Sequence, residues 1–144
     1  MNLQILAKLG LDEIVFEPGT VVLREGDLTK KVYVLISGKA VIKAKEKQLA
    51  IVDCPGTILG EIGALLGTAP VATVTTVDRS SFYVVNDFMA FLEQHPDACV
   101  SVAQVLACRL VNMNNHMVHI KGLIKDLQDG LEDYLPVFPE NPNR

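Results

Sequence analysis

Residues 57–74 read Thr57-Ile-Leu-Gly-Glu-Ile-Gly-Ala-Leu-Leu-Gly-Thr-Ala-Pro-Val-Ala-Thr-Val74 and carry the strongest local signal in the chain. Gly60 and Glu61 open a short apolar helix, which a loop and a β-branched run follow. Backbone N–H groups at a helix start bind phosphate oxygens, a glycine allows close approach to the backbone, and a carboxylate accepts hydrogen bonds from ribose hydroxyls. The stretch therefore predicts a cradle for a sugar phosphate.

The sequence on either side alternates short β-branched or aromatic runs with turn signals rich in glycine, proline and aspartate. Evenly spaced short strands indicate an antiparallel sandwich or barrel. The prediction is a mainly β fold with flanking helices, a double-stranded β-helix or jelly-roll barrel. The expected strands are residues 20–23, 31–37, 40–44, 49–52, 71–77 and 81–85, and the expected short helices are 2–9 and 87–94.

A second signal runs from Cys99 to Leu131, where apolar residues recur at alternating spacings of four and three. This is a heptad pattern, and a helix of that length, at about 1.5 Å per residue, is longer than one barrel can cover. It predicts a parallel homodimer through residues 99–131; the alternative is a helix packed wholly on its own barrel. The positions are Cys99, Ala103, Leu106, Leu110, Met113, Met117, Ile120, Ile124, Leu127 and Leu131.

Length and composition favour one domain with an extension: a helix and barrel in residues 1–97, the long helix in 98–132 and a proline-rich tail in 133–144. The net charge of -4 argues against direct nucleic-acid binding. The chain contains no membrane-spanning run of about eighteen apolar residues, and residues 1–10 lack the features of a signal peptide. We expect a cytoplasmic protein whose three cysteines are reduced.

Four segments in order, residues 16–27, residues 32–41, Gly60-Glu61 and Ala72-Thr-Val74, resemble the cyclic nucleotide-binding domain family. The resemblance covers about residues 10 to 132. It implies an eight-stranded jelly roll, a phosphate-binding cassette at residues 60–74 and a C-terminal helix that relays ligand occupancy. The possible ligand is cAMP or cGMP. The implied ligand-binding residues are Gly60, Glu61, Ile62, Gly63, Ala64, Thr68, Pro70, Val71, Ala72 and Thr73.

The chain departs from the family pattern inside the cassette. The family carries an arginine shortly before its Ala-Thr-Val, and Pro70, or Val71 with a one-residue slip, stands at that place here. Loss of a charge-assisted hydrogen bond, worth about 1.5 to 3 kcal/mol, weakens phosphate binding by about one to two powers of ten. Replacement cations from elsewhere in the sequence are Arg24, Lys39 and Arg79. Glu61 has two readings, a ribose ligand or a carboxylate that stabilises its own helix start.

Two functions remain open at this stage. One is a sensor domain that binds a small ligand weakly and relays its presence through the dimer helix. The other is a ligand-free scaffold for a protein partner, in which Pro70 or Val71 fills the former phosphate pocket. A soft-metal site at His116, His119, Met113 and Met117 is a weaker reading, since the methionines fall on the heptad core. The sequence offers no catalytic pattern, so we expect no enzyme activity and no cofactor.

Overall fold

The computed structural model describes residues 1–132, and the predicted proline-rich tail, residues 133–144, lies outside the described residues. The chain divides into two compact units, residues 1–102 and residues from Ala103 onward. The first unit contains both sheets and the short helices, and the second consists of helix as far as it is described.

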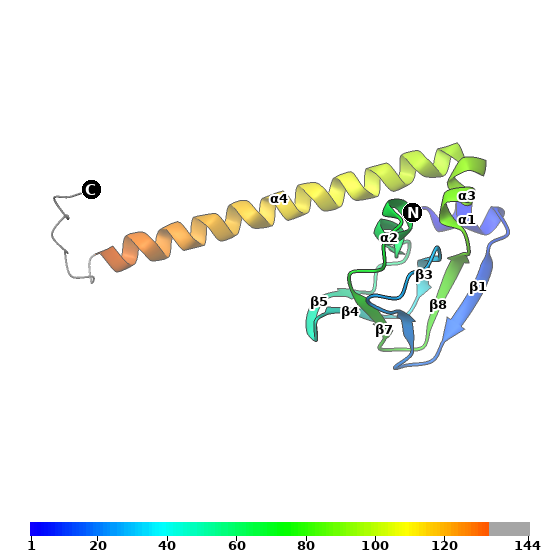
Figure 1. The fold of residues 1–144 in the computed structure, drawn as a ribbon, viewed down its shortest axis with the longest axis horizontal. Coiled ribbons are helices and arrows are strands. Elements are labelled where there is room, and N and C mark those ends of the chain that lie inside the picture. The colour runs from blue at the N-terminus through cyan, green and yellow to red at the C-terminus, as the bar shows by residue number, and fades with distance from the viewer. Residues whose placement is uncertain (133–144) are drawn as a thin grey trace. The chain divides into compact units, whose positions relative to one another are not determined.

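The first unit is built from two four-stranded antiparallel sheets, which confirms the predicted jelly roll (Figure 1). Apart from β4 and β5, which are consecutive in the chain, the neighbouring strands of both sheets are far apart in sequence, so long-range pairings hold each sheet together. One sheet has the order β1 (Asp12–Phe16), β8 (Ser80–Val85), β3 (Val32–Ser37), β6 (Ile58–Leu59), and the other β2 (Val21–Leu23), β7 (Thr73–Thr76), β4 (Ala40–Ala44), β5 (Lys47–Val52).

Two strands are missing from the sequence-based prediction, which begins the β region at residue 20. β1 lies at the edge of its sheet with Ile14 and Val15 exposed, so its residues show no alternation of buried and exposed positions. β6 has only two residues and lies directly before the cassette. The predicted strand 71–77 is shorter than expected, because the backbone becomes extended in β7 only from Thr73.

Apolar side chains from both sheets form the core, including the fully buried Leu35, Ala40 and Phe82. Burying one large aliphatic or aromatic side chain contributes about 1.5 to 3 kcal/mol. Phe16, Tyr33 and Phe82 meet edge to face, with ring centroids 5.9 to 6.2 Å apart. Burial raises the pKa of Tyr33, so its phenol is uncharged at neutral pH. The barrel interior is therefore apolar and neutral on this side.

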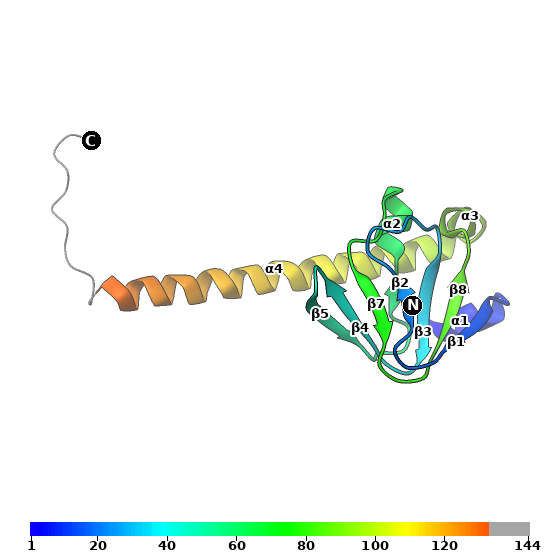
Figure 2. The same ribbon diagram turned by 60° about the horizontal axis from the view of Figure 1, so that its bottom comes forward.

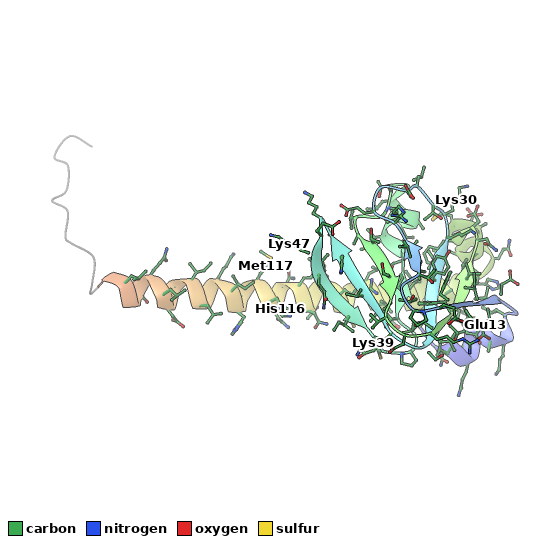
Figure 3. The ribbon with its side chains drawn as sticks, turned by 90° about the horizontal axis from the view of Figure 1, so that it is seen from below. Glu13, Lys30, Lys39, Lys47, His116 and Met117 are labelled. Atoms are coloured by element: carbon green, nitrogen blue, oxygen red, sulfur yellow. The ribbon has the colours of Figure 1, made fainter. Side chains whose placement is uncertain are left out.

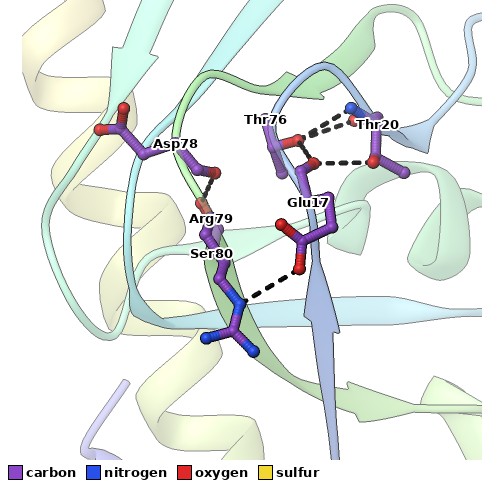
Figure 4. Close-up of polar contacts among 6 residues, drawn as sticks. All are labelled: Glu17, Thr20, Thr76, Asp78, Arg79 and Ser80. Carbon is purple, nitrogen blue, oxygen red and sulfur yellow. Dashed lines mark hydrogen bonds and ion pairs between the residues drawn. The ribbon is translucent and has the colours of Figure 1, made fainter.

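Polar contacts close the end of the barrel where β7 turns into β8. Thr76 Oγ1 donates to the Glu17 carbonyl at 2.7 Å and accepts from the Thr20 N–H at 3.0 Å (Figure 4). Gly38 lies against Ser80 with φ of +101°, and a Cβ there would come within 2.6 Å of the Ser80 Cα. Only glycine fits this position, because the backbone conformation and the contact both exclude a side chain.

Four helices accompany the sheets: α1 (Leu3–Lys8), α2 (Glu61–Leu66), α3 (Phe88–Gln94) and α4 (Pro96–Glu132). Asp87 caps α3 by accepting from the Ala90 N–H at 3.1 Å, and Pro96 begins α4 at the position where a missing N–H costs nothing. α2 lies at one end of the barrel, and the turns that follow β3 and β7 lie at the other (Figure 2). The cassette therefore lies at the end of the barrel away from those two turns.

Candidate functional site

Gly60 forms the entrance to the cassette in a conformation that other residues avoid. Its φ of +89° is left-handed, and it immediately precedes α2. A Cβ at this position would lie 3.0 Å from the Leu23 Cδ1 and 3.1 Å from the Lys31 carbonyl oxygen. The glycine thus allows the chain to turn into α2 while packed against β2 and the start of β3. The space beside Gly60 is filled by Leu23 in this conformation.

Glu61, the first residue of α2, is only 2% exposed. It engages in polar interactions, and no side chain at Gly60 caps the helix. A buried carboxylate is costly unless it is hydrogen-bonded, so its presence here marks a constrained position. Because Glu61 is covered, a ribose can reach it only if the cassette opens.

The first turn of α2 also determines which amides remain for a ligand. The Ala64 N–H donates to the Gly60 carbonyl at 3.1 Å, so it is not available to a phosphate. The backbone N–H groups that can still bind a ligand at the helix start are those of the residues before Ala64. Gly63 is buried and accepts from the Thr68 N–H at 3.0 Å, which closes the helix back onto the loop. A Cβ at Gly63 would lie 2.8 Å from the Thr68 carbonyl oxygen. Ile62 is exposed and points away from the core.

The loop after α2 does not plug the barrel with Val71. This residue is 70% exposed, which removes it as the apolar filler considered in the scaffold reading. Pro70 and Ala72 are half-buried, and Thr68 is exposed. Thr73 begins β7, and its hydroxyl accepts from the Glu25 N–H at 3.0 Å. The Thr73 side chain therefore positions a neighbouring loop, a role that the sequence does not predict.

That neighbouring loop, residues 24–27, connects β2 to the segment before β3 and adjoins the cassette directly. The Gly26 N–H donates to the Pro70 carbonyl at 3.0 Å, beside the Thr73 contact. The Glu25 carboxylate in turn accepts from the Lys45 N–H at 3.2 Å, at the turn between β4 and β5. The sequence shows Glu25-Gly-Asp27 only as a turn signal, and the pairing with residue 70 comes from the tertiary structure.

The three candidate cations fall into two groups. Arg24 belongs to the loop bound to the cassette, and it pairs with Asp27 at 3.7 Å. Arg79 pairs with Glu17 at 3.2 Å beside the Thr76 contacts, at the opposite end of the barrel (Figure 4). Lys39 donates its N–H to Ser80 Oγ at that same end (Figure 3). Of the three, the structure brings only Arg24 to the cassette.

The remaining sequence candidates lie on α4. His116 and Met117 project from the helix (Figure 3). Within residues 1–132, no three His, Cys, Asp or Glu side chains gather closely enough to hold a metal ion. In the same span, no helix is both long and apolar enough to cross a bilayer. All three cysteines are exposed thiols.

With the jelly roll and the cassette in place, comparison with known proteins defines the class. The chain belongs to the cyclic nucleotide-binding domain family, whose model matches residues 13–95. That span contains both sheets apart from the first residue of β1, together with α2 and α3. The family resemblance inferred from the sequence is confirmed.

One relative is the Pycsar effector protein XpPycTIR of Xanthomonas perforans, 33% identical over 123 residues. The match covers 81% of this chain and 40% of that protein. The fold matches the Thermus thermophilus catabolite activator protein with a TM-score of 0.70 and 22% identity, over 82% of this chain and 58% of that chain. The chain therefore spans well under two thirds of both proteins.

A third comparison concerns the ligand of a relative. A regulatory subunit of a cAMP-independent protein kinase A from Trypanosoma cruzi, solved bound to guanosine, matches with a TM-score of 0.50 and 26% identity. The match covers 53% of this chain and 28% of that chain. That regulatory subunit is thus a structural neighbour that was solved with an uncharged nucleoside.

Proposed function

We propose that this chain is a sensor domain for a nucleotide-type ligand, with a 3′,5′-cyclic nucleotide as the first candidate. The observation that carries the proposal is the family's Gly60-Glu61 pair in place at the start of α2, with Gly60 left-handed and Glu61 buried. A carboxylate and backbone amides at this point suit a ribose and its cyclic phosphate.

The binding is expected to be weak. No lysine or arginine lies between residues 47 and 79, so the cassette itself supplies only amides and hydroxyls to a phosphate. A hydrogen bond to a charged group contributes about 1.5 to 3 kcal/mol, and its absence lowers affinity by about ten- to a hundredfold. A ligand present at high concentration still occupies such a site.

An uncharged nucleoside is the second candidate ligand. Two observations favour it: the cassette has no cation of its own, and the Trypanosoma cruzi regulatory subunit was solved with guanosine. A site that lacks the cation gains little binding free energy from a phosphate, so it binds a nucleoside almost as well as the nucleotide. The ratio of nucleotide to nucleoside affinity therefore measures how much charge the site offers.

The burial of Glu61 gives ligand binding a conformational consequence. Because the carboxylate is 2% exposed, the ligand must select a state in which α2 has moved. A ligand shifts such an equilibrium only by its difference in affinity for the two states. α3 lies against α2, so movement of α2 changes the packing of the helix that precedes α4.

The long helix of the second unit has the pattern of a helix that pairs with another helix, and such pairing could transmit ligand binding. From Leu110 to Leu131, the heptad core positions of α4 are exposed in the single chain. A stripe of this kind at four-three spacing packs against a second helix with the same stripe. We propose a second copy of this chain as the partner, in a parallel homodimer through residues 99–131, which relays ligand occupancy.

Calorimetric titration of the chain with cAMP, cGMP, cCMP, cUMP and guanosine tests the proposal. We expect heat for at least one of them, with a dissociation constant in the high micromolar range or weaker. Sedimentation velocity with and without that ligand then tests the dimer and the relay. Absence of heat and of thermal stabilisation at millimolar concentrations of all five would reject the sensor in favour of the protein-binding scaffold.

A further inference from the structure

The turn formed by residues 24–27 is the part of the barrel most closely attached to the loop after α2. Its Gly26 N–H binds the Pro70 carbonyl at 3.0 Å and its Glu25 N–H binds the Thr73 hydroxyl at 3.0 Å. A further hydrogen bond, from the Asp27 N–H to the Arg24 carbonyl at 3.2 Å, closes the turn on itself. Arg24 is therefore held near residue 70, where the family pattern has its arginine.

The Arg24 side chain is exposed and weakly paired. It is 61% exposed, and its ion pair with the similarly exposed Asp27 is long, at 3.7 Å. Exposed pairs of this kind contribute little, so an anion with better geometry can displace the carboxylate. Arginine can bind a phosphate through two parallel hydrogen bonds, whereas its contact with Asp27 is a single, long ion pair.

Two other cations lie near the loop after α2. Lys43 is exposed and lies opposite Thr73 inside β4, so it does not belong to the turn that is hydrogen-bonded to residue 70. The Lys31 carbonyl lies beside Gly60, whereas the backbone nitrogen of Pro70 lies beside Gly63. Because Lys31 is exposed, its effect on binding has to be measured separately from that of Arg24.

We infer that Arg24 supplies, from a different loop, the phosphate-binding cation that the cassette lacks, with Asp27 holding the guanidinium until an anion arrives. This inference rests on the proposed function, since it names the residue that binds the phosphate in the same site. The site would thus take anionic nucleotides in preference to nucleosides.

Titration of four single variants against the tightest-binding cyclic nucleotide and against its uncharged nucleoside tests the inference. Arg24→Gln should weaken cyclic nucleotide binding about ten- to a hundredfold and leave nucleoside binding within twofold. Asp27→Asn, which releases the guanidinium, should strengthen cyclic nucleotide binding by up to about fivefold. Arg79→Gln is the matched control, because it removes the same charge from a similarly exposed pair at the far end of the barrel.

The outcomes separate this inference from the proposed function. If the unmodified chain binds neither cyclic nucleotide nor nucleoside, the proposed function fails. If it binds, but Arg24→Gln behaves like Arg79→Gln, only the role of Arg24 is wrong. A selective loss in Lys31→Gln instead of Arg24→Gln assigns the phosphate to Lys31, beside Gly60, and also overturns the inference. Circular dichroism on each variant confirms that the barrel remains folded.

Discussion

The hydroxyl of Thr76 donates a 2.7 Å hydrogen bond to the backbone carbonyl of Glu17 (Figure 4). The same oxygen accepts from the Thr20 N–H at 3.0 Å. One buried hydroxyl thereby joins β7 to the turn between β1 and β2. A two-residue turn, Pro18-Gly19, is fixed in this way to the strand that leads out of the cassette.

Replacing Thr76 with valine keeps the shape of the side chain and removes both hydrogen bonds. The Thr20 N–H and the Glu17 carbonyl each lose one partner but remain bonded to each other, so we expect a loss of about 0.5 to 1.5 kcal/mol of unfolding free energy. Chemical denaturation measures this loss. Thr76→Ser keeps the hydroxyl and should lose less than half as much, and equal losses in the two variants would attribute the effect to packing.

Gly38 and Gly67 both have positive φ but differ in their surroundings. Gly67 has φ of +66° and open space where a Cβ would stand, so Gly67→Ala should cost only the left-handed conformation, about 1 to 2 kcal/mol. Gly38→Ala adds a clash with the Ser80 backbone and should cost at least twice as much. Thermal unfolding compares the two. Similar melting temperatures would show that β8 can shift to make room.

Glu61→Gln distinguishes the two readings of this carboxylate. If Glu61 accepts from the ribose 2′-hydroxyl, the variant should weaken binding of the cyclic nucleotide about tenfold and leave binding of its 2′-deoxy form nearly unchanged. Titration of both ligands against both proteins gives the coupling between the residue and the hydroxyl. Equal weakening for the two ligands would make Glu61 a structural residue.

The dimer prediction is tested on α4 with two substitutions that add the same charge. Ile120→Lys places a cation in the heptad core, where it would be buried against its symmetry mate, and should raise the dimer dissociation constant more than about tenfold. Asn115→Lys lies on the opposite side of the helix and should leave the dimer intact. Sedimentation velocity provides the masses. A single-chain mass for the unsubstituted protein at all concentrations would refute the pairing.

Asp87 gives the barrel a pH dependence of known sign. The Ala90 N–H at the start of α3, and secondarily Lys30, lower the pKa of this carboxyl. A group with a lowered pKa stabilises the fold above its unfolded pKa, about 3.9, and this contribution disappears as the pH falls through the folded pKa. Asp87→Asn keeps the cap without the charge. The variant should be less stable than the parent at pH 7, and the difference should shrink as the pH falls below about 3.9, as measured by denaturant midpoints.

Much of the barrel could be predicted from sequence because its central strands are β-branched and bounded by glycine and proline. Ala40–Ala44 has the predicted bounds, and β3 differs by one residue. The edge strand β1 could not be found in this way, since it buries almost none of its side chains and so carries no periodic pattern. Which strand lies at the edge of a sheet is decided by long-range pairing between strands, and the local pattern of a single sequence does not reveal that pairing.

The cassette was recognisable from Gly60 and Glu61, but its contacts were not. The link from Gly26 to Pro70 joins residues 44 apart in sequence, and no local pattern predicts it. The scaffold alternative, in which Pro70 or Val71 fills the pocket, followed from the apolar nature of these residues alone. In the structure Val71 is 70% exposed, in the loop before β7 begins.

β5 contains one residue more than its partner. Ile42 pairs with Ala50 and Lys43 with Gln48, so Leu49 has no partner in β4 and forms a bulge. β5 is also an edge strand, and an edge of straight, exposed strand offers its free amides to any other chain. The extra residue bends that edge and breaks its regular hydrogen-bond spacing. Strand-by-strand addition of further chains at this edge is thereby disfavoured.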